Sequence, residues 1–295
     1  MHYKIGTRGS KLALAQSEYV RKRLEESFPE DTFELVIIST TGDKITDRPL
    51  AAIGSKGLFV REIEEELLSG EINMAVHSMK DMPGEMPAGL TFAKAWKRED
   101  CRDVLVLKSS DSFEELPAGA ILGTGSLRRA CQLAMIRQDI QFTAIRGNVD
   151  TRINKLHDEE QRLDGIVLAA AGMKRLGREN EITQYLDPEM VIPAPAQGVL
   201  AIEVLEEDKE LLEKINSLSD YNSDREAKAE RTFLMAAGGG CHMPVGAYCT
   251  TKDNGDLHMT ALYGNEDCTR LLRIEVTGTE PEAVGHEAAR MLGLE

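Results

Sequence analysis

Strand-length apolar runs alternate with stretches of helical periodicity over the first 218 residues, and this alternation restricts the possible folds more than any other feature. It is typical of α/β proteins with parallel sheets, which bind ligands beyond the carboxyl ends of their strands. The expected strands span residues 3–6, 33–40, 72–76, 91–95, 104–107, 120–122, 142–145, 165–168 and 197–204. The expected helices span residues 11–26, 58–69, 126–137, 149–158, 170–176 and 209–218. The polar stretch 41–56 has no periodicity and is interpreted as a mobile loop over a site.

The pattern restarts near residues 97–102, and prolines at 188, 193 and 195 mark a return, so we predict two α/β lobes joined by two crossovers. The last part of the chain differs, with a helix before three strands and a final helix. Capping boxes at 223–226 and 279–282 are expected to open these two helices. The predicted domains are 1–99 with 196–218, then 100–195, then a small α+β domain with an antiparallel sheet at 219–295.

Composition excludes some classes of protein. With 35 Lys+Arg against 50 Asp+Glu, the formal net charge is -15, which argues against a nucleic-acid binder. No apolar run is long enough to cross a bilayer and no signal region opens the sequence, so we expect a cytoplasmic protein without a membrane partner. Five cysteines without a C-x-x-C pair predict reduced thiols, with Cys131, Cys249 and Cys268 as small buried side chains.

Basic residues stand in the turns that follow predicted strands. They are Arg8, Lys80, Arg128, Arg129, Arg146 and Arg152. An arginine offers a planar fork of donors that matches a carboxylate, and a helix N-terminus also attracts anions. We therefore predict a multiply charged anion between the lobes. No P-loop or nucleotide-binding glycine motif is present, which favours carboxylates over phosphates.

Two residues are candidates for chemistry. Asp81 lies beside a lysine, where a carboxylate stays ionised and can stabilise a cation or move a proton; the alternative is an Asx-type turn before Pro83. Cys241 follows three glycines, which favours an exposed thiol; the alternative is a helix cap and a buried cysteine. Asp103 is assigned to a hinge salt-bridge network, and no histidine has a partner at metal-ligand spacing, so no metal is expected.

Several motifs together resemble one known family, porphobilinogen deaminase (hydroxymethylbilane synthase), along nearly the whole chain. They are Gly6-Thr7-Arg8-Gly9-Ser10-Lys11-Leu12-Ala13-Leu14, Gly54-Ser55-Lys56-Gly57-Leu58-Phe59, Ala75-Val76-His77-Ser78-Met79-Lys80-Asp81, residues 123–129 and 146–152, Ala196-Gln197-Gly198, and Gly239-Gly240-Cys241.

This resemblance implies two lobes like those of periplasmic binding proteins and a third domain that carries a dipyrromethane cofactor as a thioether on Cys241. It implies a transferase of tetrapyrrole and heme biosynthesis. By the same resemblance, the enzyme's partner is a small-molecule substrate, porphobilinogen. The enzyme would add four molecules of it to this primer with loss of ammonia and release hydroxymethylbilane by hydrolysis. Asp81 would stabilise protonated pyrrole and azafulvene species and act as the acid and base.

The same resemblance implies the binding residues. For the cofactor they are Ser78, Lys80, Asp81, Thr124, Ser126, Arg128, Arg129, Arg146 and Gln197; for the substrate they are Arg8, Ser10, Arg146, Arg152 and Lys56, the last in a lid loop. Two positions depart from the family pattern, Cys101 in place of a usual proline and Gly125 in place of a common serine.

We expect a monomer. One alternative is a two-lobed anion-binding protein without catalysis, which would hold no covalent adduct. Another is an enzyme that uses Cys241 as an acyl or redox nucleophile. That enzyme would need a histidine base, and the adjacent His242 is poorly placed to be one.

Overall fold

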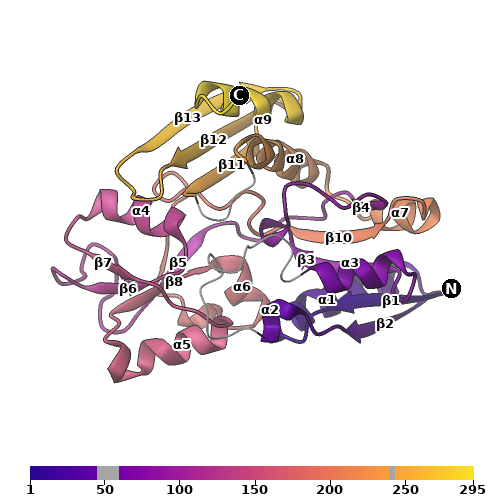
Figure 1. Ribbon diagram of the computed structural model, residues 1–295, viewed down its shortest axis with the longest axis horizontal. Coiled ribbons are helices and arrows are strands. Elements are labelled where there is room, and N and C mark those ends of the chain that lie inside the picture. Colours follow the sequence, from indigo (N-terminus) through magenta and orange to yellow (C-terminus); the bar gives the residue numbers. More distant parts are fainter. Residues whose placement is uncertain (45–59, 239–242) are drawn as a thin grey trace. The chain divides into compact units, whose positions relative to one another are not determined.

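The computed structural model describes residues 1–44, 60–238 and 243–295 (Figure 1). The chain divides into two compact units. Unit 1 comprises Met1–Arg98 and Val199–Asp224, and unit 2 comprises Glu99–Gly198 and Arg225–Glu295. The finer division of the chain into three domains stays a prediction.

Unit 1 contains a five-stranded sheet in the order β2-β1-β3-β10-β4. Its strands are β1 (His2–Thr7), β2 (Thr32–Ile37), β3 (Met74–Ser78), β4 (Leu90–Phe92) and β10 (Leu200–Leu205). β1 pairs in parallel with β2 and β3, but β10 runs antiparallel to β3 and β4, so the expectation of a parallel sheet is wrong here. A short crossover helix enforces parallel pairing, whereas β10 returns after a long excursion that leaves its direction open.

Helices cover both faces of this sheet. They are α1 (Lys11–Ser27), α3 (Arg61–Leu68) and α7 (Lys209–Asn216). Val20 of α1 and Leu211 of α7 pack in one core cluster with β1, β3 and β10, whereas Ile63 and Leu67 of α3 pack in another with Ala75. A short helix α2 (Thr41–Lys44) begins where the sequence predicts a loop, and the rest of that predicted loop lies largely outside the described residues.

Unit 2 contains a second five-stranded sheet, in the order β7-β6-β8-β5-β9. Its strands are β5 (Asp103–Leu107), β6 (Ile121–Gly123), β7 (Gln141–Thr143), β8 (Gly165–Ala169) and β9 (Gln184–Tyr185). β6 is parallel to β7 and β8, whereas β5 is antiparallel to β8 and β9. The helices are α4 (Leu127–Ile136), α5 (Val149–His157) and α6 (Ala170–Arg175). α5 and α6 pack on one core cluster, and Leu133 of α4 packs in the other.

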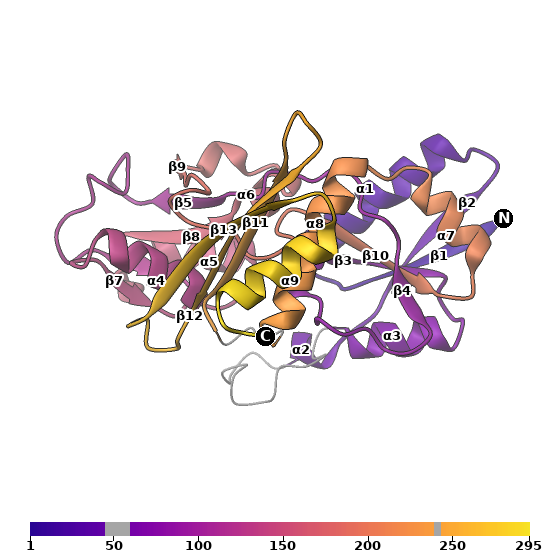
Figure 2. The same ribbon diagram turned by 90° about the horizontal axis from the view of Figure 1, so that it is seen from above.

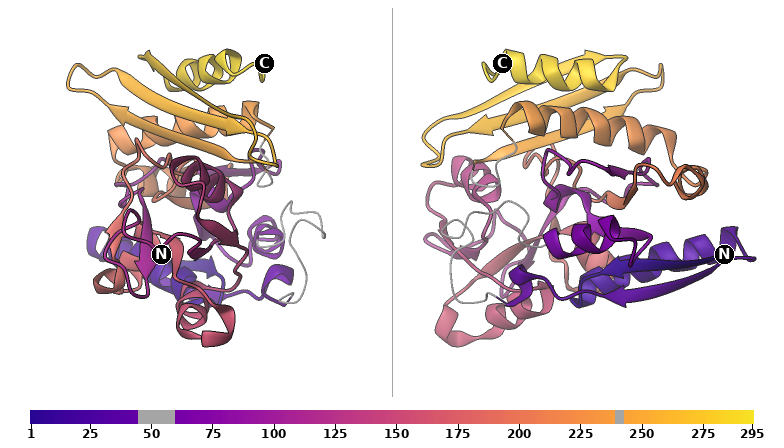
Figure 3. Two further views of the ribbon diagram at one scale, coloured as in Figure 1. Left: turned by 90° about the vertical axis from the view of Figure 1, so that its left-hand side faces the viewer. Right: turned by 45° about the vertical axis from the view of Figure 1, so that its right-hand side comes forward.

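The C-terminal part forms the predicted antiparallel sheet of three strands, in the order β11-β12-β13. Its elements are α8 (Tyr221–Ala236), β11 (Val245–Thr251), β12 (Leu257–Gly264), β13 (Leu271–Gly278) and α9 (Pro281–Met291). α8 and α9 lie along the strands (Figures 2 and 3) and share one apolar cluster with them, which includes Phe233 and Val284. Together with the two five-stranded sheets, this sheet confirms the predicted α/β class with a small α+β part.

The two predicted capping boxes are wrong. α8 begins at Tyr221, so Ser223 lies inside the helix, and its N–H donates instead to Oδ1 of Asp220 at 2.8 Å. Glu280 is the N-cap of α9 and makes no side-chain cap hydrogen bond, while Pro281 occupies the first turn. Proline suits that position because the missing N–H has no partner within the helix.

Cys131 and Cys268 form a disulfide, with their Cα atoms 5.2 Å apart, so the expectation of two separate reduced thiols is wrong. The turn between β12 and β13 brings Cys268 to α4 across a sequence separation of 137 residues, which left no local pattern to detect. Cys249 is buried, as predicted, and Cys101 is also buried.

Candidate functional site

In unit 1 the predicted site residues gather at one edge of the sheet. β1 and β3 are parallel neighbours, with Ile5 opposite Met74, so their carboxyl ends meet at the same edge. Arg8 and Ser10 follow β1 directly, while Ser78 ends β3 and precedes Lys80 and Asp81. The parallel pairing of β1 and β3 therefore places these five residues at one edge of the sheet, just past the strand ends, as predicted.

Two hydrogen bonds organise this edge. The Ser10 hydroxyl caps α1 by accepting from the N–H of Ala13 at 3.3 Å. Gln16, which is buried on α1, donates from Nε2 to Oγ of Ser78 at 2.8 Å and so ties the helix to the end of β3. Gln16 was not predicted from the sequence; its signal was a polar side chain one turn before Val20 on the inward face of α1.

Asp81 lies in a short 3-10 helix, Met79–Asp81, and its side chain is exposed. Its carboxylate makes no hydrogen bond or ion pair with any other residue in the described ranges, so an Asx-type turn does not hold it. An exposed carboxylate next to a lysine is available to a ligand and to solvent protons.

In unit 2 a second edge collects the remaining residues. β6 is parallel to both β7 and β8, so Thr124 and Ser126, which follow β6, share an edge with Arg146, which follows β7. Asp103 begins β5 opposite Ala169, the last residue of β8, and therefore lies at the same edge.

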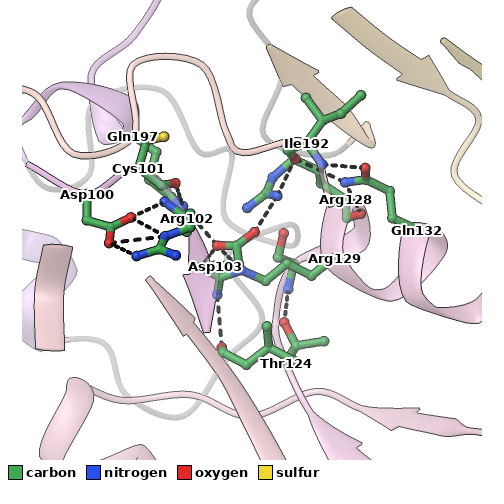
Figure 4. A network of polar contacts seen from close by, with 12 residues as sticks. Asp100, Cys101, Arg102, Asp103, Thr124, Arg128, Arg129, Gln132, Ile192 and Gln197 are labelled. Atoms are coloured by element: carbon green, nitrogen blue, oxygen red, sulfur yellow. Dashed lines mark hydrogen bonds and ion pairs between the residues drawn. The ribbon is translucent and has the colours of Figure 1, made fainter. Parts of the chain in front are cut away.

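The Asp103 carboxylate is the centre of this edge (Figure 4). Its Oδ2 accepts from Nη1 of Arg128 at 2.6 Å, and its Oδ1 accepts from Nη2 of Arg129 at 2.7 Å and from Nε at 3.0 Å. Gln197 donates to Oδ1 at 2.9 Å and to the carbonyl of Cys101 at 2.7 Å. Arg128 also donates to the Ile192 carbonyl at 2.7 Å. The sequence assigned Asp103 to a salt-bridge network, and the structure confirms that network.

Burial and charge oppose each other in this network. Asp103 is fully buried, and both arginines are nearly so. Burial alone would raise the pKa of Asp103, but Arg128 and Arg129 outweigh it and hold that pKa well below the ordinary value. Burial lowers the pKa of Arg128, against the opposite effect of Asp103. The network therefore keeps a carboxylate ionised between two guanidinium groups.

The turns that follow β6 and β7 are stabilised by local hydrogen bonds and by one glycine with a positive φ. Gly147 has a φ of 111°, a conformation that other residues rarely adopt, and the Asn148 side chain caps α5 by accepting from the N–H of Thr151 at 2.9 Å. Arg152 donates from Nε to the Gly147 carbonyl at 2.8 Å. Ser126 is the N-cap of α4 but makes no side-chain cap hydrogen bond, and its own N–H donates to Thr124 Oγ1 at 3.2 Å.

Two predicted site residues, Lys56 and Cys241, lie outside the described residues. Among the described residues of α8, Glu230 is fully buried and accepts from the N–H of Ala196 at 2.6 Å and of Cys249 at 2.7 Å. Its carboxylate therefore links the segment before Gln197 to β11 through hydrogen bonds. Glu230 was not predicted from the sequence. Its signal was a charged residue one turn from Phe233 on the apolar face of α8.

No group of three or more His, Cys, Asp or Glu side chains is arranged to hold a metal in the described ranges. Within the same ranges, the helices are too short or too polar to span a membrane.

Comparisons with known proteins agree along the chain. Residues 3–213 match the family model "Porphobilinogen deaminase, dipyromethane cofactor binding domain", and residues 225–293 match "Porphobilinogen deaminase, C-terminal domain". The porphobilinogen deaminase of Lachnospira eligens is 78% identical over 295 residues, covering 100% of both chains. That of Clostridium novyi is 48% identical, covering 98% of this chain and 97% of the relative. The solved structure of the methionine-binding protein MetQ aligns with a TM-score of 0.44 at 12% identity, over 78% of this chain and 94% of that one.

Proposed function

Because the chain belongs to the porphobilinogen deaminase family, a family of transferases in heme biosynthesis with a dipyrromethane cofactor, we propose how its residues divide the work. The substrate is porphobilinogen. The observation that carries the proposal is the buried pair Arg128 and Arg129, whose guanidinium groups bind the carboxylate of Asp103. Acetate and propionate groups on pyrroles present the same chemistry.

The donor set fits the cofactor. Each pyrrole ring of a dipyrromethane carries two carboxylates, and arginine forks and helix N-termini are the donors that such groups prefer. We assign the carboxylates to donors at the unit 2 edge and the attachment to Cys241. The donors are Thr124, Ser126, Arg128, Arg129, Arg146 and Gln197. When bound, the cofactor would supply the free pyrrole carbon to which the first substrate unit is joined, and later units would extend the chain from there.

At the unit 1 edge, Asp81 is the proposed catalytic acid and base. Its exposed carboxylate holds or releases a proton at Oδ and, when ionised, stabilises positive charge on the reacting pyrrole nitrogen. Ser78 and Lys80 on the same turn join the cofactor-binding set, while Arg8 and Ser10 orient substrate carboxylates with Arg152 and Lys56.

Three further assignments complete the proposal. Residues 219–295 form the domain that carries the cofactor, the protein is a monomer, and it acts in the cytoplasm. The cysteine pattern without C-x-x-C pairs supports the cytoplasm, whereas the Cys131–Cys268 disulfide counts against it, because cytosolic thiols are usually reduced.

Intact-protein mass spectrometry tests the proposal. The wild-type protein should carry a two-pyrrole mass increment, Cys241→Ser should lack it, and the control Cys101→Ser should keep it. An increment that survives in Cys241→Ser would contradict the attachment. A wild-type protein without any increment and without turnover of porphobilinogen would support a binding protein instead.

A further inference from the structure

Three titratable side chains, His77, Glu203 and Glu64, lie buried near one another in unit 1. His77 stands on β3, just before the turn that carries Asp81. Nε2 of His77, on β3, lies 3.1 Å from Oε2 of Glu203 on β10. Glu203 is fully buried, and the exposed fraction of the His77 residue is 7%. Glu64, on α3, is 9% exposed. None of these groups has a part in the proposed function.

The sheet register explains why they meet. β3 and β10 are antiparallel neighbours, with His77 opposite Ala201 and Ala75 opposite Glu203. Residues that face each other or lie two apart share one side of a sheet, so His77 and Glu203 point to the side of Ala75. Ile63 and Leu67 of α3 pack on Ala75, and α3 therefore places Glu64 over this side.

Among the described residues, this cluster holds two acids and one histidine. Oε1 of Glu64 and Oε1 of Glu203 are both buried, and neither has a hydrogen-bond partner within the part of the chain that the structure describes. Burial first, and then the negative charges of Glu203 and Glu65, raise the pKa of Glu64 to about 7. Because of this rise, Glu64 stays protonated to a higher pH than an exposed glutamate does, which limits the negative charge in the cluster.

The cluster also adjoins the proposed catalytic turn. His77 directly precedes Ser78, at which the turn to Asp81 begins, and the N–H of Met79 donates to the carbonyl of Val199 at 3.0 Å, one residue before β10. The turn that carries Asp81 is therefore anchored both to β3 and to the residue that precedes β10. We propose that Glu203 is a positioning residue for Asp81, which acts by holding His77 at the end of β3.

This inference rests on the proposed role of Asp81, and the same amide substitution at the two neighbouring acids tests it. Glu203→Gln removes the carboxyl group that contacts His77 and should lower kcat roughly 10- to 100-fold while KM stays within about 2-fold, since a small misplacement of a catalytic group has costs of this size. Glu64→Gln reproduces a neutral carboxyl and should keep more than half of kcat, as should the control Glu66→Gln on the same helix. A role in filling space alone would affect Glu64→Gln and Glu203→Gln alike.

A double substitution covers the case in which Glu203→Gln folds poorly. If His77 and Glu203 act as one unit, adding Glu203→Gln to His77→Ala should change kcat by less than about 2-fold beyond His77→Ala alone. Additive losses, or equal kcat values for Glu203→Gln and Glu64→Gln, would overturn the inference. An inactive Asp81→Asn beside a fully active Glu203→Gln would reject this inference alone, whereas an active Asp81→Asn would reject the proposed function.

Discussion

Replacing Asp103 with asparagine should destabilise unit 2 strongly. Asparagine keeps the shape of the side chain but not its charge. If its oxygen takes the place of Oδ1 and accepts from Arg129 and Gln197, its NH₂ group replaces Oδ2 and faces Nη1 of Arg128, a donor that now lies 2.6 Å from Oδ2. Two buried guanidinium groups then lose their counter-charge.

The size of the effect follows from burial. Breaking a fully buried ion pair by removal of one partner costs about 3–5 kcal/mol, because the remaining charge is left uncompensated. For a unit of this size, each 1 kcal/mol lowers Tm by roughly 2–4 °C, so we expect a fall of roughly 6–20 °C. The Arg128 and Arg129 pair holds the pKa of Asp103 low, so this stability is present above the pKa of an unfolded aspartate, about 4, and is lost as pH falls below it.

Calorimetry and urea unfolding at pH 7 measure this effect, with Asp100→Asn as the control. Asp100 pairs with Arg102 at 2.6 Å, and the side chains are 12% and 40% exposed, so this partly solvated pair should contribute less than the fully buried one. Equal losses of stability in the two variants, or a loss below about 1 kcal/mol in Asp103→Asn, would refute the reasoning.

Asp81→Asn should fold normally and keep the cofactor mass while turnover falls at least about 100-fold, with the exposed Glu85→Gln unchanged; wild-type turnover in Asp81→Asn would end the acid and base assignment. The pKa of Glu64 is raised from 4.5 to about 7, so wild-type stability should fall relative to Glu64→Gln as pH rises from about 4.5 to about 7. At ~1.4 kcal/mol per pKa unit the limit is about 3 kcal/mol, and partial solvation reduces it to roughly 1–2, measured by urea unfolding across that range. Thiol labelling of the denatured, unreduced protein should leave Cys131 and Cys268 unmodified, and labelling of both would remove the disulfide from the molecule in solution.

Local chemistry made much of the site predictable. Short apolar strands followed by polar turns placed Arg8 and Asp81 after parallel neighbours, and parallel neighbours end at one sheet edge whatever surrounds them. The same reasoning placed Thr124 and Arg146 at the second edge. Motifs that extend along the whole chain were enough to indicate the family, since each depends only on neighbours in sequence.

Contacts between distant residues were not predictable in this way. The antiparallel direction of β10, the disulfide between Cys131 and Cys268, and the pairing of His77 with Glu203 all join segments that no local pattern relates. Burial was equally hidden, because Glu64 and Glu230 look like ordinary surface acids of helices until the sheets that cover them are in place.

The sequence by itself therefore determined the alternating elements, the edges at which polar turns gather and the family, because these depend on spacing along the chain. Only the tertiary structure decided which charges are buried and with which partners. It made Asp103 the shared counter-ion of Arg128 and Arg129 and left Glu64 with a raised pKa, since desolvation and pairing depend on what packs around a group.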